Sequence, residues 1–195
     1  MRGAAGALAT HVVAQTDQLD RKPPRLSFEQ GAALGVPAGT AYQVLKSLGV
    51  TDGTTLLIHG GSGSVGQAAI QFARAWGATV VATAGAANQD RMRELGAIPV
   101  VYGPGLVDRV RAAAPDGIDL ILDAAGTDEA IEASFQLVDD RRQIGTIVLG
   151  SHAAELGILA WSGGSPIPHY RQGGAPSSRG CGCHGRPRGE GAVRD

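Results

Sequence analysis

Three glycines, Gly61, Gly63 and Gly66, form the pattern G-x-G-x-x-G in the stretch TLLIHGGSGSVGQAAIQ. The pattern lies between a short apolar run and a helical one, which is the context in which it predicts a phosphate-binding turn. The first glycine of such a turn permits a tight bend, the second lets a diphosphate approach the backbone, and the third lets the helix pack closely on the strand. These residue types at this spacing therefore predict a dinucleotide site.

The amides at the start of the following helix would donate the hydrogen bonds to the phosphates. Because the first N–H groups of a helix have no partner within it, those of Ser64, Val65 and Gly66 would face the ligand at the positive end of the helix dipole. With Ser62, they complete a predicted diphosphate-binding turn from Gly61 to Gly66. The alternative is that the glycines only serve a sharp turn in a chain that contains 30 of them.

The tip of the next predicted strand indicates which dinucleotide is bound. Sites for the non-phosphorylated cofactor usually carry an acidic residue about twenty residues after the turn, but Ala84 and Gly85 occupy that place here. Since a carboxylate would repel a 2′-phosphate, its absence favours NADPH over NADH. Asn88 and Arg91 follow and are candidate ligands of that phosphate. The alternative for Arg91 is an ordinary charge on a solvated helix face.

No residue stands out as the proton donor of a reaction. The candidates are Tyr42, His59 and Asp123, and each has a plainer interpretation. Tyr42 fits a packed helix residue, His59 a satisfied residue at a strand end, and Asp123 a helix-capping or loop carboxylate. We therefore assign no catalytic residue and predict no metal site.

From Leu56 onward, β-rich runs alternate with helical patterns, which predicts an α/β fold: a Rossmann-type, doubly wound parallel sheet. Strands are predicted at Thr55–His59, Thr79–Thr83, Ile98–Val101, Ile118–Leu122, Ile144–Leu149 and Gly157–Trp161. Helices are predicted at Val65–Trp76, Asn88–Leu95, Leu106–Ala114 and Thr127–Val138. Ahead of them, Ser27 with Gln30 predicts a helix start and Pro37 predicts a second helix after it. Residues Ala9–Val13 resemble one isolated strand.

The composition excludes several classes of function. A formal net charge of −1 with 18% charged residues favours neither nucleic acid nor an anionic membrane, so a small molecule is the expected partner. The two cysteines, Cys181 and Cys183, lie near His184 without the spacing of a zinc site, and they form no disulfide framework. We recognise no targeting signal and no membrane span. A cytoplasmic location is therefore expected.

From about Ala9 to Pro166 the chain resembles the medium-chain dehydrogenase/reductase superfamily, closest to its zinc-independent quinone oxidoreductase-like branch. The linked motifs are GTAYQVLKSLGVTDGTTLLIHGGSGSVG, ELGAIPVV, DLILDAAG and RRQIGTIVLG. The stretch GALATHVVAQTDQLDRKPPRLSFEQGAAL resembles the strand and linker that close the family's GroES-like catalytic domain. The expected domains are a remnant of that domain in 1–25, a dinucleotide-binding Rossmann domain in 26–166, and a disordered Gly/Arg-rich tail in 167–195.

The resemblance implies further site residues. Thr40 is expected near the nicotinamide, and the loops at Gly126 and Gly150 are expected to line the cofactor cleft. The zinc-dependent alcohol dehydrogenases of the superfamily place a metal ligand four residues before that threonine, where this chain has Val36. Because valine cannot ligate zinc, catalytic zinc is not expected.

These expectations together predict hydride transfer from NADPH to a quinone, enone or other carbonyl acceptor. The chain holds little sequence like the GroES-like domain, and family-like sequence ends at about Pro166. We therefore expect a truncated product, and the sequence leaves open whether this product catalyses the reaction. The alternatives are a non-catalytic nucleotide-binding fragment and a relative of the zinc-type alcohol dehydrogenases. By analogy with related folds, a homo-oligomer paired through sheet edges also stays open.

Overall fold

The computed structural model describes residues 21–162 and 165–166, and before them only Thr10, His11, Val13, Thr16 and Leu19. The strand expected at Ala9–Val13 falls partly outside these residues, and its described members are exposed and not in a strand. The tail from 167 to 195 lies outside the described residues, as do Cys181, Cys183 and His184.

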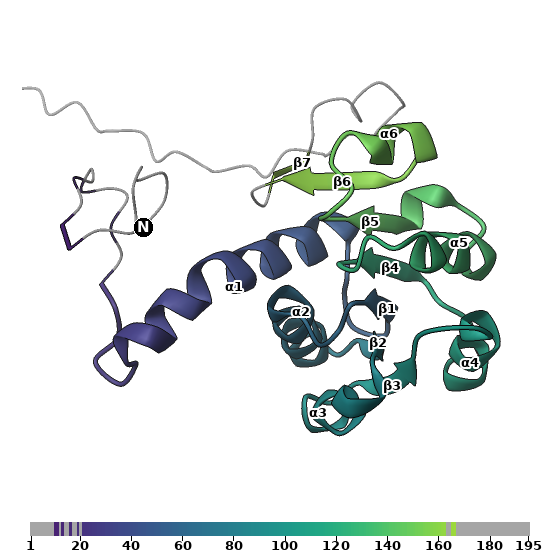
Figure 1. Cartoon of the computed structure of the whole chain (residues 1–195), viewed down its shortest axis with the longest axis horizontal. Helices are drawn as coiled ribbons and strands as arrows, with labels where there is room; N and C mark the ends of the chain where they lie inside the picture. Colours follow the sequence, from purple (N-terminus) through teal and green to yellow (C-terminus); the bar gives the residue numbers. More distant parts are fainter. Residues whose placement is uncertain are drawn as a thin grey trace, which may run out of the picture.

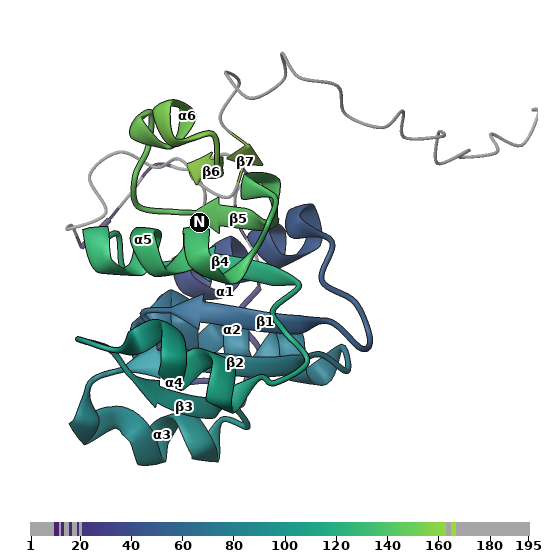
Figure 2. The ribbon, with the colours of Figure 1, turned by 90° about the vertical axis from the view of Figure 1, so that its right-hand side faces the viewer.

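Within the described residues, seven strands form one sheet in the order β3-β2-β1-β4-β5-β6-β7. Strands β1 to β6 pair in parallel, and only the short β7 is antiparallel. The strands are β1 Thr55–His59, β2 Thr79–Ala84, β3 Ile98–Val101, β4 Leu120–Asp123, β5 Ile144–Thr146, β6 Leu159–Ser162 and β7 Ser165–Pro166. Figure 2 shows them stacked in this order. The order of the six parallel strands is that of doubly wound dinucleotide-binding folds, so the predicted fold class is confirmed.

Helices cover both faces of the sheet, as Figure 1 shows. They are α1 Phe28–Leu48, α2 Ser64–Ala75, α3 Gln89–Glu94, α4 Leu106–Ala113, α5 Asp128–Leu137 and α6 His152–Leu156, with short 3-10 turns at Ala86–Asn88 and Arg141–Gln143. Because successive side chains of a strand point to opposite faces, Leu56 and Ile58 of β1 pack in the cluster that contains α1 and α2. Leu57 packs in the cluster that contains α4 and α5. The sheet is therefore buried between two apolar layers.

The long helix α1 differs from the sequence prediction. It begins at the expected capping box, in which Ser27 accepts from the Gln30 amide and the Gln30 side chain accepts from Ser27. It then runs without a break to Leu48, with Pro37 inside it, so the second helix predicted after Pro37 was wrong. Proline keeps a helical φ and removes only one backbone donor, and this loss does not end the helix here.

Strand β5 is shorter than predicted and ends at Thr146 instead of Leu149. The Thr146 hydroxyl accepts from the amides of Val148 and Leu149, which turns the chain away from the sheet. A five-residue helix, α6, then follows, and Gly157 ends it in the left-handed conformation at φ 72°. For this reason β6 begins at Leu159 and not at Gly157.

Candidate cofactor site

The turn between β1 and α2, residues Gly60 to Gly66, is called the glycine turn from here on. Strand β1 ends at His59, and the chain bends at Gly60, whose φ of 77° favours glycine. A Cβ on Gly60 would lie 2.9 Å from the carbonyl oxygen of Ala124. The tight bend therefore belongs to Gly60, and its assignment to Gly61 from the sequence pattern was wrong.

Gly61 and Gly66 are required by close packing and not by an unusual φ. The Gly61 amide donates to the carbonyl of Thr83 at 2.8 Å, and a Cβ on Gly61 would lie 2.9 Å from both the Ala82 Cβ and the Met92 Sδ. A Cβ on Gly66 would overlap the Gly60 carbonyl oxygen and lie 2.8 Å from the Gly61 Cα. Gly66 thus has the role that the pattern predicts for its third glycine, which is close contact of helix and strand.

The first turn of α2 has free donors. Its N-cap residue, Gly63, provides no side-chain cap, and the first turn contains no acidic residue. Within the described part of the chain, the side chains of Ser62 and Ser64 make no hydrogen bond. The N–H groups of Ser64, Val65 and Gly66 have no intrahelical acceptor. This arrangement fits the diphosphate of a dinucleotide, because uncapped amides and the helix dipole favour an anion at this end.

The tip of β2 carries no carboxylate, and a residue that the sequence analysis missed lies beside it. Val101 of β3 is in register with Ala84, which places Tyr102 next to Gly85. A Cβ on Gly85 would lie 3.3 Å from the Tyr102 hydroxyl oxygen, and the tyrosine is 58% exposed. The sequence does show that Tyr102 directly follows a predicted strand. Its place beside Gly85 could not be inferred, because it depends on the pairing of β3 with β2.

Arg91 is connected to the glycine turn through Gln67. Its Nε donates to the Gln67 side-chain oxygen at 3.3 Å, and the Gln67 amide nitrogen donates to the Ser62 carbonyl at 2.9 Å. The Arg91 guanidinium also pairs with Glu94 at 3.0 Å on the exposed surface, where an ion pair contributes little stability. Asn88, the other predicted phosphate ligand, is exposed and ends the 3-10 turn before α3. Both roles stay predictions.

The loop after β4 lies next to the glycine turn, and the loop after β5 lies next to the loop after β4. Gly60 is in close contact with Ala124, and Gly126 (φ 67°) approaches Val148 so closely that a Cβ would lie 2.8 Å from its Cγ2. Gly150 has φ 54°, and a Cβ there would meet nothing within 4 Å. Thr40 is half-buried on α1, one residue before the buried Ala41. The expected roles of Gly126, Gly150 and Thr40 stay predictions as well.

Each of the three candidate proton donors has a structural surrounding: His59 and Asp123 are buried, and Tyr42, although 47% exposed, packs on two aromatic rings. Tyr42 packs edge-on against Phe72 and Trp76, with ring centroids 5.7 and 5.6 Å away. His59 is 1% exposed, and burial lowers its pKa to about 4, although the nearby charge of Asp123 acts in the opposite direction. The carboxylate of Asp123 is fully buried and accepts from the amides of Ala125 and Gly126. This is the loop-carboxylate role that its sequence position suggested.

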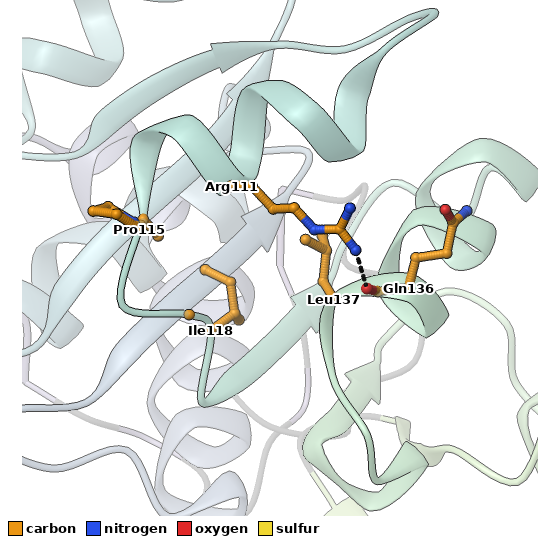
Figure 3. A pocket seen from close by; sticks show the side chains of 7 residues that line it. Arg111, Pro115, Ile118, Gln136 and Leu137 are labelled. Atoms are coloured by element: carbon orange, nitrogen blue, oxygen red, sulfur yellow. Dashed lines mark hydrogen bonds between the residues drawn. The ribbon is translucent and has the colours of Figure 1, made fainter.

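A hollow lies on another part of the molecule, as Figure 3 shows. It has a volume of about 340 Å³ and is lined by Arg111, Ala114, Pro115, Gly117, Ile118, Gln136 and Leu137. The Arg111 guanidinium donates to the Gln136 carbonyl across it at 3.1 Å. Because Ile118 lies two residues before β4 begins at Leu120, this hollow is at the amino ends of the strands, opposite the edge where ligands of open α/β sheets bind.

The described residues offer neither a metal site nor a membrane span. Among them there is no group of three or more His, Cys, Asp and Glu side chains that could hold a metal ion. Val36, at the position of the superfamily's zinc ligand, is 76% exposed on α1. In the same residues, every helix is too short or too polar to cross a bilayer.

Known proteins resemble the chain over this region. Residues 64–159 match the family model of zinc-binding dehydrogenases. The quinone oxidoreductase of Homo sapiens is 44% identical over 82 residues, which are 42% of this chain and 25% of that protein. The quinone oxidoreductase of Sus scrofa is 38% identical over 124 residues, which are 61% of this chain and 38% of that protein. The chain therefore spans less than half the length of these curated relatives.

Solved structures agree with the sequence relatives. The quinone oxidoreductase of Coxiella burnetii superposes with a TM-score of 0.59 at 28% identity, covering 73% of this chain and 46% of that one. The quinone oxidoreductase of Thermus thermophilus, solved also as its complex with NADPH, superposes with a TM-score of 0.56 at 27% identity, covering 72% of this chain and 47% of that one. Strand order, glycine turn and these likenesses lead to one conclusion: the chain belongs to the medium-chain dehydrogenase/reductase superfamily and is quinone oxidoreductase-like.

Proposed function

We propose that the chain binds NADPH along the carboxyl edge of its sheet. Its activity would be that of a zinc-independent oxidoreductase, which transfers hydride from NADPH to a quinone or another carbonyl or enone acceptor. The observation that supports this most directly is the first turn of α2. Its amides are uncapped, no acidic residue opposes an anion there, and Gly63 leaves the backbone accessible. The glycine turn is the proposed diphosphate site, with Gly61, Ser62, Ser64, Val65 and Gly66 as its other members.

Preference for the phosphorylated cofactor is proposed from the groups around Gly85. A carboxylate at that position would repel a 2′-phosphate, and the residue there is a glycine with the Tyr102 hydroxyl beside it. Arg91 adds a positive charge on α3, and its surface pairing with Glu94 is weak enough to be exchanged for a phosphate. Tyr102, Arg91 and Asn88 are therefore the proposed 2′-phosphate ligands.

When bound, the cofactor would supply the hydride, and the protein would position it. The loops at Gly126 and Gly150 and the half-buried Thr40 of α1 are proposed to border the nicotinamide end. His59 and Asp123 are buried below this edge, so we assign neither of them a proton transfer to substrate.

Cofactor preference is tested by calorimetric titration with NADPH and with NADH. We expect tighter binding of NADPH, and in Tyr102→Phe a loss of about tenfold in NADPH affinity with unchanged NADH affinity, since a hydrogen bond to a charged group contributes about 1.5–3 kcal/mol. Tyr42→Phe is the matched control, because Tyr42 is also a partly exposed tyrosine, at 47% against 58%. Equal affinity for both nucleotides would contradict the preference.

Turnover is tested by following NADPH oxidation with a panel of quinones and enones, with and without a metal chelator. Oxidation that the chelator leaves unchanged supports the proposal, and oxidation that it abolishes supports the zinc-type alternative. Binding without oxidation supports the alternative, a non-catalytic nucleotide-binding fragment. Absence of NADPH binding would refute the proposed function.

A further inference from the structure

We propose that four buried polar side chains, one on each of four adjacent strands, position the loops of the cofactor edge. This polar row consists of Thr83 on β2, His59 on β1, Asp123 on β4 and Thr146 on β5, and all four are at most 2% exposed. The proposal rests on the proposed function, because these loops are the ones assigned to the cofactor. It makes the four residues positioning residues and not catalytic ones.

The row follows from strand register. His59 is in register with Asp123, and Asp123 with Thr146, while the His59 Nδ1 lies 3.3 Å from the Thr83 hydroxyl oxygen. Two residues earlier on the same strands, the same face carries an apolar row that is buried against α4 and α5: Val81, Leu57, Ile121 and Ile144. The face therefore changes from apolar to polar at the last register before the loops. A buried polar group costs free energy unless it is hydrogen-bonded. The hydrogen-bond partners of the four side chains therefore indicate which parts of the chain the polar row holds in place.

The partners of Asp123 belong to the loop after β4 and to the next strand. One carboxylate oxygen, Oδ1, accepts from the amides of Ala125 at 3.0 Å and Gly126 at 2.9 Å. The other, Oδ2, accepts from the Thr146 hydroxyl at 2.8 Å. The carboxylate thus has three donors, and it holds the loop of Gly126 to strand β5.

The two threonines do the same for the neighbouring loops. The Thr146 oxygen accepts from the amides of Val148 at 3.2 Å and Leu149 at 3.4 Å, in the loop that leads to Gly150. The Thr83 hydroxyl oxygen accepts from the amide of Gly60 at 3.3 Å, at the bend of the glycine turn. Side chains of the polar row therefore accept hydrogen bonds from backbone amides in the loops after β1, β4 and β5.

His59 lies between the two halves of the row, in contact with Thr83 and in register with Asp123. Burial keeps its imidazole neutral at pH 7, since its pKa is lowered to about 4, and its Nε2 has no hydrogen-bond partner among the described residues. The Asp123 carboxylate is consequently balanced by the loop amides and the Thr146 hydroxyl, and not by an imidazolium. Loops held by buried acceptors lose less conformational entropy when a ligand binds, which raises affinity.

The test compares variants of strand β5. Thr146→Val removes the hydroxyl, Thr146→Ser restores it, and Ile144→Val is the matched control in the apolar row of the same strand and face. Each is measured by NADPH affinity, by hydrogen exchange of the loop amides and by thermal unfolding. Thr83→Val gives a second site, at which the effect should be confined to the bend at Gly60.

We expect Thr146→Val to weaken NADPH binding and to speed exchange at Val148 and Leu149, each by about tenfold, as for loss of more than one hydrogen bond. Thr146→Ser should stay within about twofold of the unsubstituted chain. Ile144→Val should lower the unfolding temperature without either effect. Equal affinity and exchange in Thr146→Val and Ile144→Val would refute the proposal. If the unsubstituted chain binds no NADPH, the proposed function fails, and the exchange rates alone decide whether the polar row orders the loops.

Discussion

Replacing Gly66 with alanine should destabilise the fold, whereas replacing Gly63 with alanine should weaken NADPH binding and leave the fold intact. The two glycines are three residues apart in the same turn, but their surroundings differ. A Cβ on Gly66 would overlap the Gly60 carbonyl oxygen and lie 2.8 Å from the Gly61 Cα and 2.9 Å from the Gly61 oxygen, all of them backbone atoms. A Cβ on Gly63 would meet only the Gly60 oxygen, at 3.4 Å.

The structure gives the size of each effect. Overpacking costs typically about 1–3 kcal/mol, and the backbone atoms around Gly66 cannot move aside as a side-chain end would, so the upper part of that range applies. Alanine regains roughly 0.5–1 kcal/mol of helix propensity. The net loss for Gly66→Ala is therefore about 2 kcal/mol, which lowers Tm by roughly 4–8 °C in a chain of this size. Gly63 has φ −70° and ψ 162°, which alanine adopts freely, so its change in stability should stay within about 0.5 kcal/mol.

Both variants are measured by thermal unfolding and by calorimetric titration with NADPH. In Gly63→Ala the methyl group would keep the diphosphate from the amides of α2, and we expect affinity to fall at least about tenfold. Gly35→Ala on α1 is the control, because its added Cβ would meet nothing within 4 Å. Unchanged NADPH affinity in Gly63→Ala would refute the assignment of the diphosphate to this turn. An unchanged Tm in Gly66→Ala would refute the packing argument.

Three further outcomes are expected. Because the folded pKa of His59 is about 4 against 6.5 unfolded, the unfolded chain binds the extra proton between these values, and the free energy of unfolding should be about 2 kcal/mol lower at pH 5 than at pH 7.5. Urea unfolding would measure this, and a difference that persists in His59→Gln would assign it to other groups. A Cβ on Gly145 would overlap the buried Trp161 ring, so Gly145→Ala should cost about 1–3 kcal/mol and shift Trp161 emission to the red in a Trp76→Phe background; an unshifted spectrum would contradict the packing. Ser27→Ala removes the capping box and should cost about 1 kcal/mol locally, seen as faster amide exchange in the first turn of α1 and not in α2.

Much of the fold could be predicted from short apolar runs. Strands β1 and β3 have the predicted bounds, and α2 differs by one residue at each end. The wrong predictions of element ends occurred where the structure depends on one hydrogen bond or one residue and not on the pattern of the surrounding run. The Thr146 hydroxyl ends β5 by capturing two amides, and Pro37 looks like a helix break although its φ suits a helix.

The candidate site was predicted only in part. The three glycines and the missing acid at Gly85 are readable in the sequence, because they lie within one strand, turn and helix. Tyr102 was missed, since its place beside Gly85 depends on the pairing of β2 with β3. Assignment of the tight bend to Gly61 was wrong because either of two adjacent glycines satisfies the pattern, and only the backbone shows that Gly60 has the positive φ.

Local patterns in the chain were enough to specify most of its strands, most of its helices and its glycine turn, because hydrophobic periodicity and turn chemistry act between near neighbours. Register across the sheet decided the rest. The polar row joins His59 to Thr83 and Asp123 to Thr146, residues 24 and 23 positions apart. A hydrogen bond between such distant residues exists only once strand order and register have been set by the burial of both faces of the sheet.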